Sequence, residues 1–274
     1  MIKTRIAKKH RWKEAALQNI DAAYQTVRSK SPLPEVDSAL LRFMVEECDF
    51  DVEHADGSFL DHLYFCWEYT LEHYPVRSPI VMLLHSILGT GTNTFAMEAE
   101  KIPALRALMN EFEWTHVEAF PSVLRLLYDR SLRQDLRHNM ARLSQLEAVR
   151  FHRVIDNEPI TMKTEDFWIQ LNFQLIHLID FLPVSNWSTH ANDTAFIIFR
   201  DLYGLLNEAG KLETKLGYTP ASSGQGLKDE EQGFGGWLTT LIPVSLSEKM
   251  AAKSVRKFSS RINHSMDYDL VWKS

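Results

Sequence analysis

The chain is poor in cysteine and has no long apolar run. Only Cys48 and Cys66 occur among its 274 residues, and their spacing matches neither a disulfide framework nor a metal knuckle. The longest uncharged stretch, near 232–247, contains glycine and proline and is too short to cross a bilayer. The N-terminal residues lack the apolar segment of a signal peptide. These absences predict a cytoplasmic protein with no membrane partner.

Basic residues are fewer than acidic residues. The chain has 30 basic and 36 acidic residues and a net charge of −6, which argues against nucleic acid as the main partner. The basic residues between Lys3 and Lys13 are local and are interpreted as the solvated face of a first helix. With 45% hydrophobic residues the chain can bury a substantial core. We expect a small-molecule substrate as the partner, and a homodimer is left open.

Strand-like alternation is not convincing anywhere in the chain, so the sequence predicts an all-α fold. The segment from Asp156 to Pro159 indicates a turn or hairpin. After Pro220 the composition changes to a glycine-rich link, followed by a basic segment at 249–261. The predicted helices span about 6–29, a segment ending near 47, 58–74, 80–88, 94–112, 121–147, 164–182 and 193–216.

The predicted helix at 80–88 is apolar on every face until His85. Ser78 suits its N-cap, Pro79 its first position, and Gly89 the left-handed residue after its end. A helix without a polar face is expected to be buried on all sides. Because an unpaired buried polar group costs about 1 to 3 kcal/mol, His85 must face something polar inside the protein. A backbone carbonyl or a neighbouring hydroxyl is the simplest such partner.

A second predicted helix also carries a histidine. Ser58 and Asp61 have the spacing of a capping box for a helix reaching about Tyr74. His62 lies at the edge of the apolar stripe of this helix, one turn before Cys66. If the two helices are neighbours, His62 and His85 can meet.

The stretches His54-Ala-Asp-Gly-Ser-Phe-Leu-Asp-His-Leu63 and Leu84-His-Ser-Ile-Leu-Gly-Thr90 resemble the HD-domain metalloproteins. They look closest to an uncharacterised HD-like family in which serine and then a Gly-Thr turn follow the second histidine. The superfamily includes phosphohydrolases and, in a smaller branch, iron oxygenases such as myo-inositol oxygenase. The resemblance covers about residues 50–185 and implies an HD-domain-like helical bundle. It divides the chain into N-terminal helices (1–50), an HD-like core (51–185) and a helical C-terminal extension (186–274).

Carried over residue by residue, the resemblance implies a metal site. His62 matches the first HD histidine, His85 the second, and Asp180 the late aspartate from a distant helix. Ser86 stands where the motif has aspartate, and a neutral hydroxyl is a poor ligand for a hard divalent cation. A two-metal centre is therefore not expected. The remaining set of His62, His85 and Asp180 implies one divalent ion, Fe, Mn or Zn, with open coordination positions.

Other residues are candidates for the catalytic or binding set. The HD-like pattern includes a histidine at His54, which is interpreted as a third nitrogen ligand, a proton donor or a surface loop residue. His177 lies one turn before Asp180 and is interpreted as its supporting partner, as a ligand, or as a packing residue. Thr90, in the turn at 89–94, is placed to hydrogen-bond a substrate if that turn lines the pocket.

Two further pairs are conditional. His116 and Glu118 join a polar pocket only if their expected loop folds inward. Arg77 and Arg106 are candidates for binding phosphate only through their proximity in the sequence.

Three functions follow from these residues. The first is metal-dependent hydrolysis of a small substrate, phosphorylated or not, and the second is oxygen activation by a mononuclear iron site. The third is a binding or scaffold protein that has lost its metal together with the motif aspartate. Hydrolysis leads by analogy with the wider superfamily.

Overall fold

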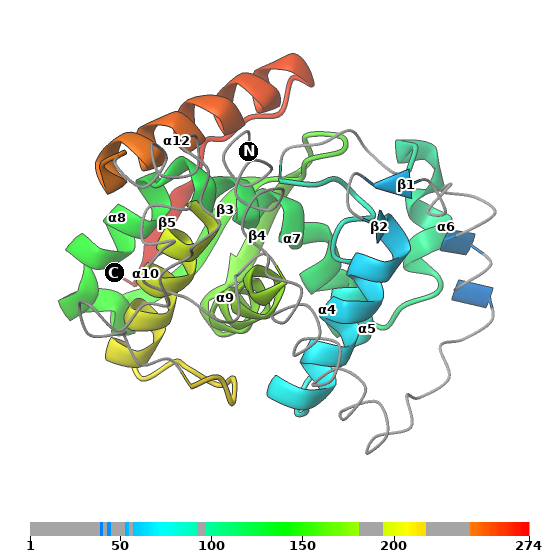
Figure 1. Ribbon diagram of the computed structural model, residues 1–274, viewed down its shortest axis with the longest axis horizontal. Helices are drawn as coiled ribbons and strands as arrows, with labels where there is room; N and C mark the ends of the chain where they lie inside the picture. Colours follow the sequence, from blue (N-terminus) through cyan, green and yellow to red (C-terminus); the bar gives the residue numbers. More distant parts are fainter. Residues whose placement is uncertain are drawn as a thin grey trace, which may run out of the picture.

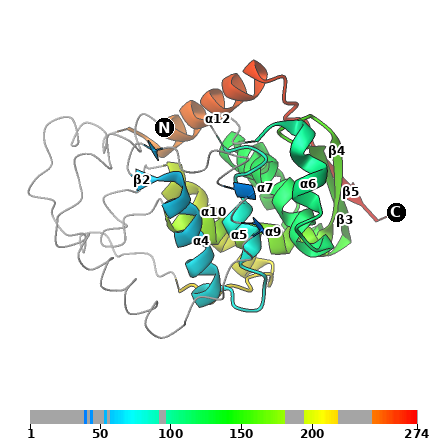
Figure 2. The same cartoon turned by 90° about the vertical axis from the view of Figure 1, so that its right-hand side faces the viewer.

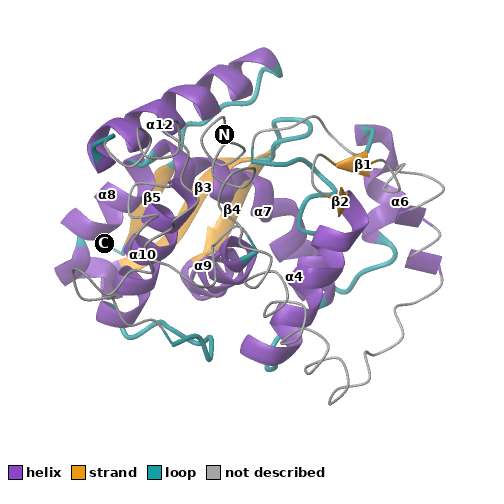
Figure 3. Cartoon of the chain, in the orientation of Figure 1, coloured by secondary structure: helices purple, strands orange, loops and turns teal. Residues whose placement is uncertain are grey.

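The computed structural model describes residues 39–40, 43–44, 53–54, 57–91, 97–180, 194–217 and 242–273. These residues are mostly helical with a small three-stranded sheet (Figure 3). The prediction of a broadly helical fold is confirmed, and its all-α form is wrong. The helix predicted at 6–29 lies outside the described residues, as does nearly all of the one ending near 47. Among the described helices, none is both long and apolar enough to cross a membrane.

Two helices build the first half of the site. A two-stranded ribbon, β1 (Glu53–His54) with β2 (Gly57–Ser58), leads directly into α4 (Phe59–His73). The core side of α4 is made by Leu63, Cys66, Trp67 and Thr70, all buried. Their three- and four-residue spacing is the helical repeat that the sequence indicates.

The second helix, α5 (Ile80–Leu84), follows Pro79 and is shorter than predicted. Residues 85–88 form turns, and Gly89 has φ 137°, where a side chain would be strained. The whole stretch from Val81 to Gly89 is buried, so the predicted burial on all sides is confirmed. The early end places His85 at the C-cap of α5.

The next long helix begins ten residues before the predicted start at Pro121. In α7 (Glu111–Asp129), Asn110 is the N-cap, and its side chain accepts from the backbone N–H of Glu113 at 2.9 Å. The Glu113 carboxylate accepts from the Asn110 backbone N–H at 3.0 Å, which completes a capping box. This box explains the early start, and Pro121 lies inside the helix. The helix predicted at 94–112 is replaced in its described part by η2 (Ala99–Lys101) and α6 (Ile102–Arg106).

The predicted helix at 121–147 is also wrong in its second half. Beyond α7 the chain forms α8 (Ser131–His138), η3 (Met140–Gln145) and then β3 (Leu146–His152). The hairpin expected at 156–159 is confirmed, because β3 pairs antiparallel with β4 (Pro159–Lys163) across a turn in which Asn157 has φ 61°. β5 (Asp269–Trp272) pairs with the other edge of β3, so the strand order is β4-β3-β5.

The sequence of β3 does not alternate strictly between apolar and polar residues, and the structure shows why. In β3, Ala148 and Val149 are both buried although they are consecutive, and the register with β5 shifts between Leu146 and Ala148. Such an irregularity moves neighbouring side chains off the strict period of two. The correction to the all-α prediction therefore concerns a short, bulged strand and its two partners.

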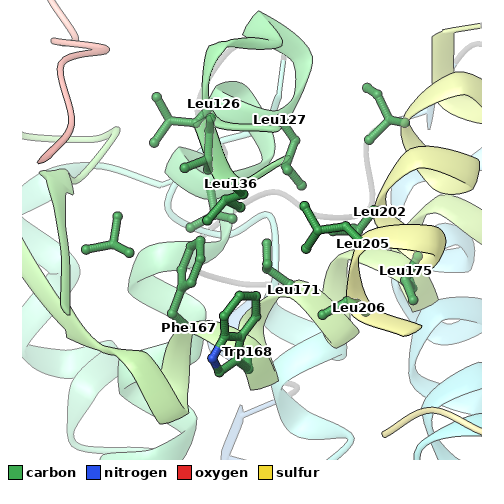
Figure 4. Close-up of a cluster of buried hydrophobic side chains, with 14 of the residues drawn as sticks. Leu126, Leu127, Leu136, Phe167, Trp168, Leu171, Leu175, Leu202, Leu205 and Leu206 are labelled. Atoms are coloured by element: carbon green, nitrogen blue, oxygen red, sulfur yellow. The ribbon is translucent and has the colours of Figure 1, made fainter. Parts of the chain in front are cut away.

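Helix α9 (Thr164–Ile179) lies at the centre of the described structure (Figure 1) and is buried from Phe167 to Leu178. It packs against α4, α7, β3 and α10 (Thr194–Glu208). α12 (Val244–Arg261) lies along α7, on the upper side of both views (Figures 1 and 2). Leucine and aromatic side chains of four helices form the apolar cluster of Figure 4: Leu126, Leu127, Leu136, Phe167, Trp168, Leu171, Leu175, Leu202, Leu205 and Leu206.

Candidate metal centre

His85 is fixed in one tautomer by the end of its own helix. Its Nδ1 lies 2.6 Å from the carbonyl oxygen of Met82, one turn earlier. Since a carbonyl only accepts, Nδ1 carries the proton and Nε2 presents a lone pair. Burial lowers the pKa of His85 well below its usual value, and neighbouring His62 lowers it further. His85 is therefore a neutral imidazole whose Nε2 is available as a ligand.

His62 reaches the same point from α4. Its Nδ1 lies 2.6 Å from Oδ2 of Asp180, and its Nε2 lies 3.2 Å from Nε2 of His85. Because the Asp180 carboxylate accepts the Nδ1 proton of His62, it is Nε2 of His62 that faces the lone pair of His85. Either a proton or a cation must lie between these two nitrogens. Two nitrogens bound tetrahedrally to one ion at about 2.1 Å lie roughly 3.4 Å apart, close to the observed spacing.

His177 completes a group of three imidazoles. It projects from α9, and its ring centroid lies 4.7 Å from that of His85 and 5.4 Å from that of His62. One ligand nitrogen from each of the three rings can be chosen so that all lie within 4.8 Å of one another. Burial, and then the two neighbouring histidines, lower the pKa of His177 well below its usual value. Three imidazoles thus converge, and together they could hold one metal ion.

The predicted ligand set differs from this arrangement in its third member. His62 and His85 meet, as expected of neighbouring helices. Asp180, at the C-cap of α9, contacts the far nitrogen of His62, while His177 supplies the third close nitrogen. The one-turn spacing of His177 and Asp180 is the sequence signal for this exchange of roles.

Two side chains outside the predicted set also line the group. Phe120 of α7 packs against His85 and His177, with ring centroids 4.8 and 5.4 Å away. The Sγ atom of Cys66 lies 3.8 Å from Nδ1 of His62. Burial, and then the charge of Asp180, raise the pKa of the Cys66 thiol well above its usual value. Cys66 therefore stays a neutral thiol beside His62.

The conditional pair His116 and Glu118 lies on α7 rather than on a loop. His116 is buried, and its Nδ1 lies 2.9 Å from Oε1 of Gln170. Glu118 accepts a hydrogen bond of 2.8 Å from Arg153. Neither residue is among the three imidazoles, so the expected inward-folding loop is corrected to a helix whose polar side chains pair elsewhere.

The remaining candidates have other partners or are not described. The carbonyl oxygen of Thr90 accepts from Nε of Arg125 at 3.0 Å. Arg77 pairs with Glu213 at 2.8 Å, and Arg106 pairs with Glu111 at 3.2 Å. His54 lies in β1, and its side chain falls outside what the structure describes.

Comparison with known proteins adds no relative: no family model, no curated protein and no solved structure matches this chain. The chemistry of the site therefore has to be argued from its own geometry.

Proposed function

We propose that the protein is a metal-dependent hydrolase with one ion held by His62, His85 and His177. A single observation carries this proposal. The Nε2 atoms of His62 and His85 face each other at 3.2 Å, while the Nδ1 atoms of both rings are engaged by other acceptors. Histidine ligands typically show this arrangement, in which the outer nitrogen donates to a carboxylate or a carbonyl and the inner nitrogen binds the metal.

Three imidazoles favour zinc among the candidate ions Fe, Mn and Zn. A mononuclear iron oxygenase typically uses two histidines and a carboxylate as ligands, whereas Asp180 contacts the outer nitrogen of His62. A set of three histidines that leaves one position open is a known catalytic zinc arrangement. When bound, such an ion polarises a substrate oxygen and lowers the pKa of a bound water to about 7. This supports hydrolysis over oxygen activation.

The protein's own residues orient the imidazoles and shield part of the site from solvent. Asp180 and the Met82 carbonyl hold the rings of His62 and His85 in the tautomers that direct Nε2 inward. Phe120 covers two of the rings. Ser86 is buried next to His85 in the chain, and its hydroxyl in place of a carboxylate supports one ion rather than two.

The broader assignment rests on the sequence. The HD-domain-like core and a small substrate, phosphorylated or not, are proposed from the resemblance of the His54–Leu63 and Leu84–Thr90 motifs. A cytoplasmic location is proposed from the composition. The mostly helical structure is compatible with that resemblance.

Elemental analysis of protein purified without a metal-binding tag tests the proposal. We expect about one zinc ion per chain in the wild type and a large loss in His85→Ala. His138→Ala is the matched control because His138 is exposed on α8. Iron in place of zinc would favour the oxygenase. If no metal is retained even after reconstitution with zinc, a proton bridges His62 and His85, and the metal-free scaffold function replaces the hydrolase.

A further inference from the structure

Arg125 is a buried cation without an acid. Its side chain projects from α7 and is 0% exposed. Nε donates to the Thr90 carbonyl at 3.0 Å, and Nη1 donates to Oγ of Ser259 at 3.0 Å. The third nitrogen, Nη2, is buried without a hydrogen-bond partner. No carboxylate of the described residues forms an ion pair with Arg125, although buried charges are normally paired.

The groups near Arg125 are a hydroxyl, an imidazole and the ring of Phe258, whose centroid lies 5.5 Å from Cζ. Oγ of Ser259 accepts from Arg125 and lies 3.5 Å from Nδ1 of His264, to which its hydroxyl donates. His264 donates from Nε2 to the carbonyl of His152 at 3.0 Å, and Nδ1 of His152 is buried without a hydrogen-bond partner. Burial, and then the charge of Arg125, lower the pKa of His264 to about 4, so this ring is neutral near pH 7. Arg125, whose pKa burial lowers to about 10, stays charged.

From the buried guanidinium of Arg125, which has no acid among the described residues and an unpartnered Nη2, we infer an anion-binding site between α7, the end of β3 and α12. Its ligand is one oxyanion group, a phosphate or a carboxylate, bound through Nη2 of Arg125. A planar guanidinium suits such oxygens. Because Arg125 exposes none of its surface, the bound group must be small. This site does not depend on the proposed metal.

A cluster of arginines elsewhere in the described structure is a less suitable anion site. A cleft of about 420 Å³ between α8, α10 and α12 is lined by several arginines. Arg133, however, pairs with Asp201 and Glu248 there, and Arg137 pairs with Asp201 and Glu208. Those cations are already neutralised, whereas Arg125 is not. The exposed Arg200 of this cleft provides a matched control.

The oxyanion group has two sources that an experiment can separate. One is free phosphate. The other is an anionic group of a larger molecule that also binds at the metal site. Phosphate binding that persists in His85→Ala identifies a self-contained site. Phosphate binding that is strong only when zinc is loaded indicates that the anion belongs to a molecule that also binds the metal. Both results require Arg125.

Thermal unfolding and calorimetric titration with inorganic phosphate at constant ionic strength test the inference. With phosphate about 100-fold above its Kd, we expect the wild-type Tm to rise by about 5 °C. Arg125→Met should abolish this shift, and Arg200→Met should keep it. A shift that persists in Arg125→Met, one that is lost in Arg200→Met, or no shift in the wild type would each overturn the site.

Because Arg125 is buried and Arg125→Met can prevent folding, Ser259→Ala is a second variant. It removes the hydroxyl that accepts from Nη1 and leaves the charge of Arg125 in place. We expect phosphate to bind at least about 3-fold more weakly to Ser259→Ala than to the wild type, because the guanidinium is no longer held at Nη1. Unchanged binding in this variant contradicts the site. Metal content, measured separately, shows whether the hydrolase proposal fails at the same time.

Discussion

Oδ2 of Asp180 lies 2.6 Å from Nδ1 of His62, across 118 residues of sequence. This contact joins the end of α9 to the first turn of α4 and decides which nitrogen of His62 faces His85. The carboxylate therefore acts on the candidate metal site through an imidazole, by fixing its tautomer and raising its basicity.

Replacing Asp180 by Asn tests that role. The amide oxygen can still accept the Nδ1 proton of His62 but carries no charge, so we expect zinc affinity to fall by about 10- to 100-fold. Competition with a chromophoric chelator measures the change. Glu165→Gln is the control, since it removes an exposed carboxylate at the start of the same helix. Equal zinc affinity in Asp180→Asn and the wild type would show that the contact does not tune the site.

The identity of the third ligand can be decided by comparing two truncations. His177→Ala should lose more zinc than Asp180→Ala, because only His177 places a nitrogen within 4.8 Å of the other two. Circular dichroism and the unfolding midpoint should be recorded for both variants, since His177 is buried. The reverse order of zinc loss would assign Asp180 as the ligand.

Acid should destabilise the protein partly through His116. Burial lowers its pKa to about 4, whereas an unfolded histidine titrates near 6.5. Below pH 6.5 the unfolded state binds a proton that the native state does not, so stability falls as the pH drops from about 6.5 to about 4. The full effect is on the order of 3 kcal/mol. Urea unfolding at pH 7 and pH 4.5 should show a smaller loss in His116→Gln than in the wild type.

The control for that titration is His138→Gln, because His138 is exposed. It should lose as much stability between the two pH values as the wild type. If His116→Gln behaves like this control, protonation of His116 is not coupled to unfolding.

Arg133 should be a major stabilising residue. It is nearly buried and donates to the Leu127 carbonyl at 2.9 Å, to Asp201 at 2.6 Å and to Glu248 at 3.0 Å. Arg133→Met removes the donor to the Leu127 carbonyl and leaves Asp201 with Arg137 and Glu248 with Arg130 as their remaining cations. We expect it to cost about 1 to 3 kcal/mol of unfolding free energy. Arg200→Met, an exposed change on the neighbouring helix, should stay within about 0.5 kcal/mol. Denaturant titration of both variants checks the difference, and similar costs would contradict this role of the ion-pair network.

Local sequence patterns predict part of the fold. Apolar residues at three- and four-residue spacing predict α4 and α10, because an amphipathic helix must bury one face whatever its partner is. The hairpin turn at Asn157 and the backbone of Gly89 are local as well, since both depend on conformations that few residues adopt without strain. Helix limits are less accurate: the predicted start at Pro121 lies ten residues after the first residue of α7, which follows the capping box at Asn110.

By itself, the sequence determined that His85 is buried and that His62 lies on an amphipathic helix, because burial and periodicity are properties of short segments. Only the tertiary structure decided that His177 rather than Asp180 is the third close group, and that β5 joins the sheet. Such choices depend on which atoms of distant segments come within a few ångströms, and local pattern cannot fix a side chain's direction to that precision. The unmatched charge of Arg125 is visible only there for the same reason.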